Sequence, residues 1–199
     1  MCTLYPTGVI VAMSLSPTKY EILATMLLLD KPEKATNIAK EAGKEFPSVM
    51  MHIIGLTRMG YTASPEKGLY ALTEKGKKAL GIPAVNSENA QTLLADKPDD
   101  TSFNFYAALG KPLGLQARGL QDFCNKIVNV NSDSIDFHTS RGDFEAWFAG
   151  LGDVELAKKT ALLKEKKMGG EALRSRLTAL VKNRCMALAN VAGHAVSPE

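Results

Sequence analysis

The order of helix, turn and hairpin signals in residues 35–81 constrains the fold of this chain more than any other feature. Two apolar segments with helical spacing are closed by Gly43 and Gly60, residues that commonly end helices. Two short alternating segments, YTAS and LYAL, then flank residues 65–68, whose Pro and Gly favour a tight turn. Thr73 is placed to cap a following helix. The sequence therefore predicts helix, turn, helix, hairpin and helix.

An additional helix is expected before this stretch, beginning at Ser16–Pro17 and ending near Asp30. Its apolar arc is wide, so we expect burial on two sides. The later helix from about Pro47 has an inward stripe made of Val49, Ile53 and Leu56. Elements in this order are typical of a winged helix-turn-helix, which presents one helix and one hairpin to the DNA groove and backbone.

The segment from Val49 to Leu56, followed by Gly60-Tyr61 and by Leu72-Thr73-Glu74-Lys75-Gly76, carries a family resemblance. It resembles the recognition helix, wing entry and wing exit of MarR-like and ArsR-like archaeal and bacterial transcription regulators. The resemblance covers residues 16–81. It implies transcription regulation, with double-stranded DNA as partner and a homodimer on a palindromic site. We expect the dimer to form through the first and the last helix.

The surface of the third helix that would face the groove is unusually apolar. Its side chains are Ser48, Met50, Met51 and Ile54, with Gly55 beside them. Base edges are normally read by side chains such as Arg, Lys, Asn or Gln, whereas Met and Ile contact only a thymine methyl or exclude water. An exposed apolar patch also marks protein interfaces. A protein-interaction adaptor that uses the same helix is therefore the alternative to a DNA-binding regulator.

Basic side chains surround this helix in the sequence. Residues 1–81 hold ten Lys and Arg against seven Asp and Glu, a small excess that contact with phosphates favours. The residues expected at the DNA are Lys40, Lys44, Ser48, Met51, Arg58 and Lys67. Further lysines, Lys75, Lys77 and Lys78, lie nearby. We expect His52 to pack within the helix-turn-helix core rather than to contact a phosphate.

The remaining chain predicts a mainly α fold in two units. We expect an N-terminal tail at 1–15, the winged helix at 16–81, an acidic linker at 82–101, a helical domain at 102–190 and a C-terminal tail at 191–199. The linker assignment rests on four acidic residues against one lysine, with Asn, Ser and Pro around them. Residues 103–109, FNFYAAL, fit either a strand or an apolar anchor.

The second unit contains a distinctive sequence motif at residues 135–156, IDFHTSRGDFEAWFAGLGDVEL. With its flanking segments it resembles an uncharacterised archaeal and bacterial domain family over residues 103–188, which implies no activity. Its polar residues predict a pocket for an anionic or nucleotide-like ligand, lined by His138, Arg141, Asp143 and Trp147. The alternative is structural: Asp143 and Asp153 cap helices, Arg141 pairs with Asp136 or Glu145, and Trp147 is core.

Net charge, cysteine spacing and the missing enzyme motifs reduce the number of function classes that fit this chain. The net charge is only +3, so no strong polyanion partner is implied. The three cysteines, Cys2, Cys124 and Cys185, have no zinc or disulfide spacing, which indicates reduced thiols in the cytoplasm. We expect no metal and no cofactor. Motifs of common enzyme classes are missing, so an enzyme centred on His138, Arg141 and Asp143 is the least favoured hypothesis.

Overall fold

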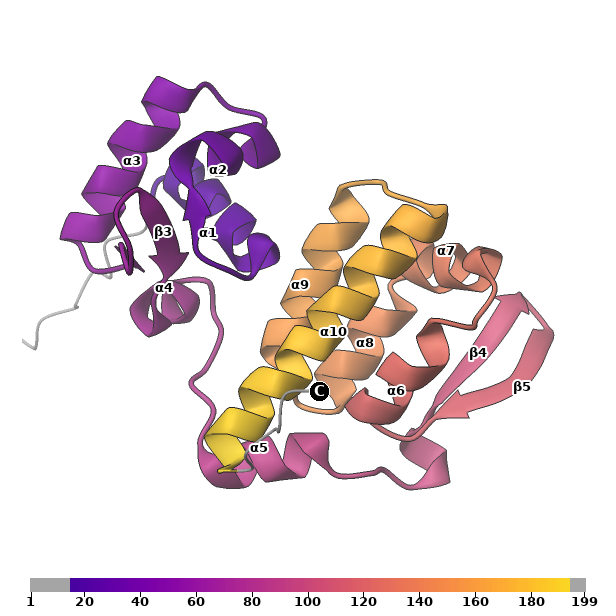
Figure 1. The fold of residues 1–199 in the computed structure, drawn as a ribbon. Helices are drawn as coiled ribbons and strands as arrows, with labels where there is room; N and C mark the ends of the chain where they lie inside the picture. Colours follow the sequence, from indigo (N-terminus) through magenta and orange to yellow (C-terminus); the bar gives the residue numbers. More distant parts are fainter. Residues whose placement is uncertain (1–14, 194–199) are drawn as a thin grey trace, which may run out of the picture.

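The structure, a computed structural model, describes residues 15–193 and is mainly helical, as the sequence predicts. Most of the two expected tails, at 1–15 and 191–199, lies outside the described residues, as does Cys2. An N-terminal unit with a winged-helix arrangement packs against a larger helical unit (Figure 1). The N-terminal unit contains α1 (Pro17–Leu29), β1 (Glu33–Lys34), α2 (Ala35–Ala42), α3 (Phe46–Arg58), β2 (Thr62–Ala63), β3 (Leu69–Leu72) and α4 (Glu74–Ala79).

Apolar stripes of α1, α2 and α3 meet in the core of the N-terminal unit. Val49, Ile53 and Leu56 are fully buried on one side of α3, so the inward stripe expected from the sequence is confirmed. A small sheet with strand order β1-β3-β2 packs against this core through Tyr70 and Leu72 of β3. β1 was not expected from the sequence, because two residues carry no detectable alternation.

Residues 72–76, Leu-Thr-Glu-Lys-Gly, connect the wing to α4 and fix their contact. The Thr73 side chain accepts a hydrogen bond from the Gly76 amide (3.1 Å) and donates to Gly60 O (2.7 Å), so it caps α4 and closes the wing. A Cβ on Gly76 would lie 2.2 Å from Tyr61 O. Only glycine therefore allows α4 to pack this closely on the strand entering the wing.

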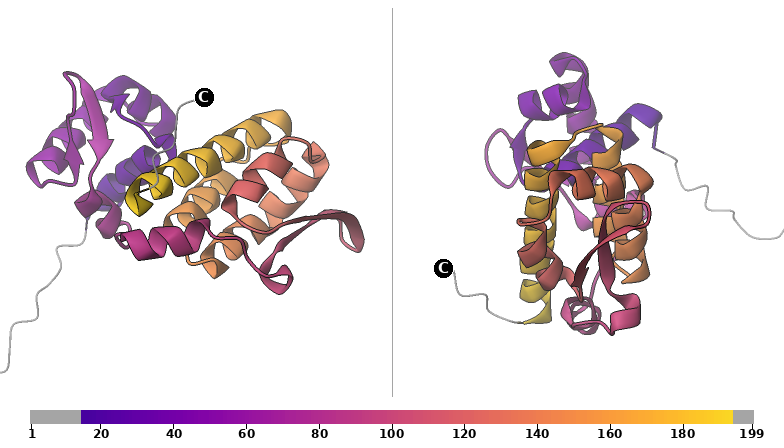
Figure 2. Two further views of the ribbon diagram at one scale, coloured as in Figure 1. Left: turned by 60° about the horizontal axis from the view of Figure 1, so that its bottom comes forward. Right: turned by 90° about the vertical axis from the view of Figure 1, so that its right-hand side faces the viewer.

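The helical unit is built from one hairpin, six α-helices and one short 3-10 helix. Its elements are α5 (Ser87–Leu94), the short 3-10 helix η1 (Asp99–Thr101), β4 (Phe103–Ala108), β5 (Lys111–Ala117), α6 (Leu120–Ile127), α7 (Ser132–Arg141), α8 (Asp143–Gly150), α9 (Val154–Glu165) and α10 (Gly170–Ala192). The β4–β5 hairpin extends from the end of the molecule opposite the N-terminal unit (Figure 2). Residues 103–108 thus form a strand and Leu109 lies in the turn, while the partner strand β5 was missed because Pro112 and Gly114 hide the strand pattern.

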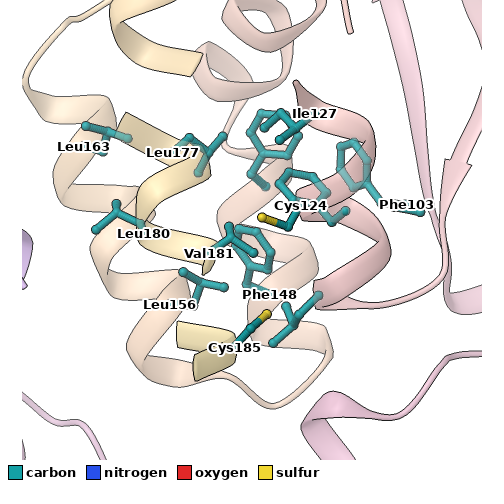
Figure 3. Packing of buried hydrophobic residues seen from close by; sticks show 14 of the residues in the cluster. Phe103, Cys124, Ile127, Phe148, Leu156, Leu163, Leu177, Leu180, Val181 and Cys185 are labelled. Carbon is teal, nitrogen blue, oxygen red and sulfur yellow. The ribbon is translucent and has the colours of Figure 1, made fainter. Parts of the chain in front are cut away.

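Segment 82–101, expected to be a linker, contributes to the core of the helical unit. Ala90 and Leu93 of α5 are buried against α10. The core around α10 contains Phe103, Phe148 and both described cysteines, which are free and buried (Figure 3). Burial raises the pKa of the Cys185 thiol to about 12, so this thiol stays protonated and unreactive.

A cluster of buried ions joins the two units. Lys159 on α9 is 1% exposed and binds Glu155 (2.7 Å) and, across the junction, Asp30 at the end of α1. Arg184 on α10 binds both Asp153 (2.8 Å) and Glu155 (2.9 Å). The three acids are balanced by three cations, the third being Lys77 of α4, whose Nζ lies 3.2 Å from Glu155 Oε2.

Backbone carbonyls at the junction also accept hydrogen bonds from basic side chains of the helical unit. Lys158 donates to Leu80 O (2.7 Å), Lys166 to Glu41 O (2.6 Å) and Arg176 to Leu28 O (3.1 Å). The second side of α1 is therefore covered by α9 and α10 of the same chain. This is the face that we expected to form a homodimer contact.

We predict that Arg184→Met lowers the free energy of unfolding by about 3 kcal/mol, because it leaves the charges of Asp153 and Glu155 buried and uncompensated. Urea denaturation measures the loss. Arg118→Met is the matched control, since Arg118 is half exposed and pairs with Asp99 on the surface. The control should change stability by less than about 1 kcal/mol. Equal losses in the two variants would contradict the importance of the cluster.

We also expect a stability loss in acid that depends on Glu155. Burial favours its protonated form, but Lys159, Arg184 and Lys77 outweigh burial and lower the pKa of Glu155 to about 2 from the ordinary 4.5. The contribution of this carboxylate is thus complete above pH 4.5 and is lost as the pH falls toward 2. Urea denaturation between pH 6 and pH 2 should show a shallower decline for Glu155→Gln. Parallel profiles would contradict this assignment.

Candidate functional site

The outer face of α3 is open to solvent in the described chain. Met51 is 63% exposed, Ile54 40% and Phe46 45%, while Met50 is half-buried against the N-terminal core. Ser48 and Gly55 are partly exposed beside them, and a Cβ at Gly55 would meet no atom within 4 Å. α3 lies on the side of the N-terminal unit remote from α9 and α10 (Figure 1). The helical unit therefore leaves this face uncovered.

Three of the basic residues expected at the DNA are exposed around this surface. Lys40 lies on α2, Arg58 in the last turn of α3 and Lys67 in the wing turn. None of the three has an ion-pair or hydrogen-bond partner among residues 15–193 for its side chain. Their charges are free to contact phosphates.

Other lysines that the sequence placed near the DNA are engaged within the fold. Lys44 pairs with Glu21 (2.5 Å), and Lys75 donates to Met59 O (2.7 Å) while lying over the Tyr61 ring. Lys77 points into the junction, where it pairs with Glu155. Lys75 and Lys78 are both exposed, and the Lys78 side chain has no ion-pair or hydrogen-bond partner among residues 15–193. His52 is half-buried on α3 and makes no side-chain hydrogen bond with the described part of the chain.

A second site lies between the β4–β5 hairpin and the junction of α7 with α8. It is a pocket of about 400 Å³. His138, Arg141 and Asp143 line it, as expected, but Trp147 does not. The further lining residues are Phe103, Asn104, Tyr106, Leu109, Gly110 and Phe137. The hairpin residues were missed because their distance from the motif in sequence exceeds 25 residues and no local pattern connects them.

His138 holds the hairpin against α7. Its Nε2 accepts the Tyr106 backbone N–H (2.8 Å), so Nδ1 carries the proton and donates to Asp143 Oδ2 (2.8 Å). Ser134 of the same helix donates to Tyr106 O (2.7 Å). Burial lowers the pKa of His138, and the bond to Asp143 opposes this only in part. Both ring nitrogens are thus occupied, and neither is free to bind a ligand.

Asp143 holds Arg141 as well as His138. Arg141 Nε lies 3.1 Å from Asp143 Oδ2, and its guanidinium lies over the Phe137 ring, 5.2 Å from the centroid. Asp143 does not cap α8, in contrast to the structural alternative considered from the sequence, whereas Asp153 does cap α9 through the Leu156 amide (3.0 Å). Arg141 pairs with neither Asp136 nor Glu145 among the described contacts.

Trp147 stands behind the pocket wall instead of forming it. Its ring packs against Phe103 (5.3 Å between centroids) and Phe123 (5.4 Å), and its Nε1 donates to Thr101 O (2.9 Å). It therefore supports Phe103, which does line the pocket. Residues 15–193 contain no group of three or more His, Cys, Asp or Glu side chains arranged to hold a metal ion.

Comparisons with known proteins add no assignment: no family description, curated protein or solved structure matches this chain. The resemblances seen in the sequence accordingly remain predictions. Within the described range, no helix combines the length and the apolar character needed to cross a membrane.

We predict that NMR of the imidazole nitrogens shows His138 neutral, with its proton on Nδ1, at pH 6.5. Its pKa lies below the ordinary value of 6.5, whereas an unfolded chain takes up the proton near that pH. The contribution of His138 to stability is therefore present above pH 6.5 and decreases as the pH falls below it. A protonated ring at pH 6.5, or a proton on Nε2, would contradict the bonding described above.

Proposed function

We propose that this protein is a DNA-binding transcriptional regulator that docks α3 and the wing onto duplex DNA. The observation that carries the proposal is the outer face of α3, which is exposed on a helix that lies remote from the helical unit (Figure 1). A helix-turn-helix protein needs such a free face to enter the major groove. The helical unit then serves as a rigid support with a pocket of its own.

Lys40, Arg58 and Lys67 are suited to contact phosphates on the two sides of α3. Phosphate contacts position a protein on the duplex without reading its sequence. Met51 and Ile54, at the centre of the face, offer only apolar contact, for example with thymine methyl groups. We therefore expect binding that is strongly salt-dependent and only modestly selective for sequence.

A protein-interaction adaptor is the second candidate, and the exposure of Phe46, Met51 and Ile54 favours it. Apolar side chains grouped on one helix face are typical of surfaces that bind another protein. In that function the same face would bind an apolar partner, and the surrounding cations would contribute little. The two candidates differ in their response to salt and to an added charge.

We predict that fluorescence anisotropy detects binding of the purified chain to short duplexes of mixed sequence at low salt. With three phosphate contacts per chain, the slope of log K against log salt should be about −3. Lys67→Ala should weaken binding to all sequences about equally and reduce the slope by about 1. Lys111→Ala, at the exposed start of β5 in the other unit, is the matched control and should change neither quantity. Absence of binding at about 50 mM salt would exclude the proposal.

Met51→Arg separates the two candidates. On a DNA-binding face the added guanidinium gains a phosphate or base contact, so affinity for the duplex should rise severalfold. On an apolar protein interface the same charge would be buried unpaired and would weaken the interaction. Met168→Arg, at an exposed methionine of the helical unit, controls for the added charge. Equal changes in both variants would show only a nonspecific effect of charge and count against docking through α3.

A further inference from the structure

We propose that the pocket between the β4–β5 hairpin and the α7–α8 junction binds a small organic monocarboxylate with an apolar body, through the free end of Arg141. A pocket of about 400 Å³ lies within the range of small-molecule sites. The hairpin and α7, which line this pocket, lie at the other end of the molecule from α3 (Figure 1), so the proposal holds whether or not the chain binds DNA.

The side chain of Arg141 is held in place with its two terminal nitrogens unused. Of the three guanidinium nitrogens, only Nε donates to Asp143, at 3.1 Å and 3.4 Å, and Cζ lies over the Phe137 ring. Nη1 and Nη2 have no acceptor within residues 15–193. A guanidinium fixed in this way presents a paired-donor geometry that matches the two oxygens of a carboxylate.

The charge around the pocket favours one negative charge on the ligand rather than two. Arg141 contributes +1 and Asp143 contributes −1, and the imidazole of His138 already uses both nitrogens inside the protein. A carboxylate at the Nη atoms can accept two charge-assisted hydrogen bonds from the guanidinium, whose charge it shares with Asp143. A second charge, as on a phosphate monoester, would find no other cation in the lining and would be repelled by Asp143.

The rest of the lining suits an apolar ligand body, aromatic or aliphatic. The rings of Phe103, Tyr106 and Phe137 form the walls, and Leu109 at the hairpin turn is 81% exposed at the edge. An aromatic group could pack against these rings, while the amide of Asn104 offers a single polar contact. The leucine is then covered when the ligand binds, which gives an otherwise unexplained apolar side chain a function.

Isothermal titration calorimetry with three probes tests the proposal on the full chain. Phenylacetate should bind with a Kd of about 1 mM or tighter, as expected for about ten non-hydrogen atoms in a preformed pocket. Phenylacetamide, which has the same shape and no charge, should bind at least about tenfold more weakly. Phenyl phosphate should also bind more weakly than phenylacetate. Amide NMR shifts on adding phenylacetate should be confined to residues 103–110 and 137–143.

Arg141→Gln should weaken phenylacetate binding about tenfold while leaving the thermal unfolding temperature unchanged, because this side chain is 51% exposed. Arg118→Gln is the matched control: its side chain is 52% exposed, it also pairs with an aspartate, and it lies outside the pocket lining. It should bind phenylacetate as the unmodified chain does. The proposal is overturned by failure of phenylacetate to saturate, by equal binding of the amide, by tighter binding of phenyl phosphate, or by an equal effect of the two variants.

Discussion

The buried charge cluster at the junction is the constraint on which the arrangement of this molecule depends. Asp30, Asp153 and Glu155 lie against Lys77, Lys159 and Arg184, and most of these side chains are removed from solvent. Such a cluster adds little net stability compared with an apolar junction of similar shape, but it tolerates almost no displacement, because any separated ion would remain buried without its partner. Its main consequence is therefore geometric: it fixes the N-terminal unit in one orientation.

That orientation determines which surfaces remain for other molecules. α1, which we expected from the sequence to lie at a homodimer interface, is covered on both sides by its own chain. α4 faces the junction through Lys77, so one of its three lysines is used inside the molecule. The outer face of α3 and the wing turn remain exposed, together with Lys40, Arg58 and Lys67. At the other end, the hairpin completes a pocket that α7 and α8 alone could not form.

Local patterns in the sequence predicted local structure well. The stripe of Val49, Ile53 and Leu56, the wing turn and the Thr73 cap all depend on neighbours a few residues away, and all are present. The sequence could not reveal α5 as part of the core, since Ala90 and Leu93 are buried by α10, about 90 residues later. The same reason accounts for the pocket: His138, Arg141 and Asp143 were foreseen, but Tyr106 and Leu109 reach them only through the fold. Asp143 had the sequence position of a cap, but its carboxylate binds His138 and Arg141 and does not cap α8.

Oxidative footprinting of the methionines tests most directly whether the outer face of α3 is left free for a duplex. Met26 in the core is 4% exposed, Met51 on α3 is 63% exposed, and Met168 on the helical unit is 39% exposed. Without DNA, at the protein concentration used for binding, Met51 and Met168 should be oxidised rapidly and Met26 slowly. Added duplex DNA should then slow the oxidation of Met51 and leave the rates of Met26 and Met168 unchanged. If Met51 without DNA is oxidised as slowly as Met26, the outer face of α3 is buried against another protein molecule, which would contradict the account.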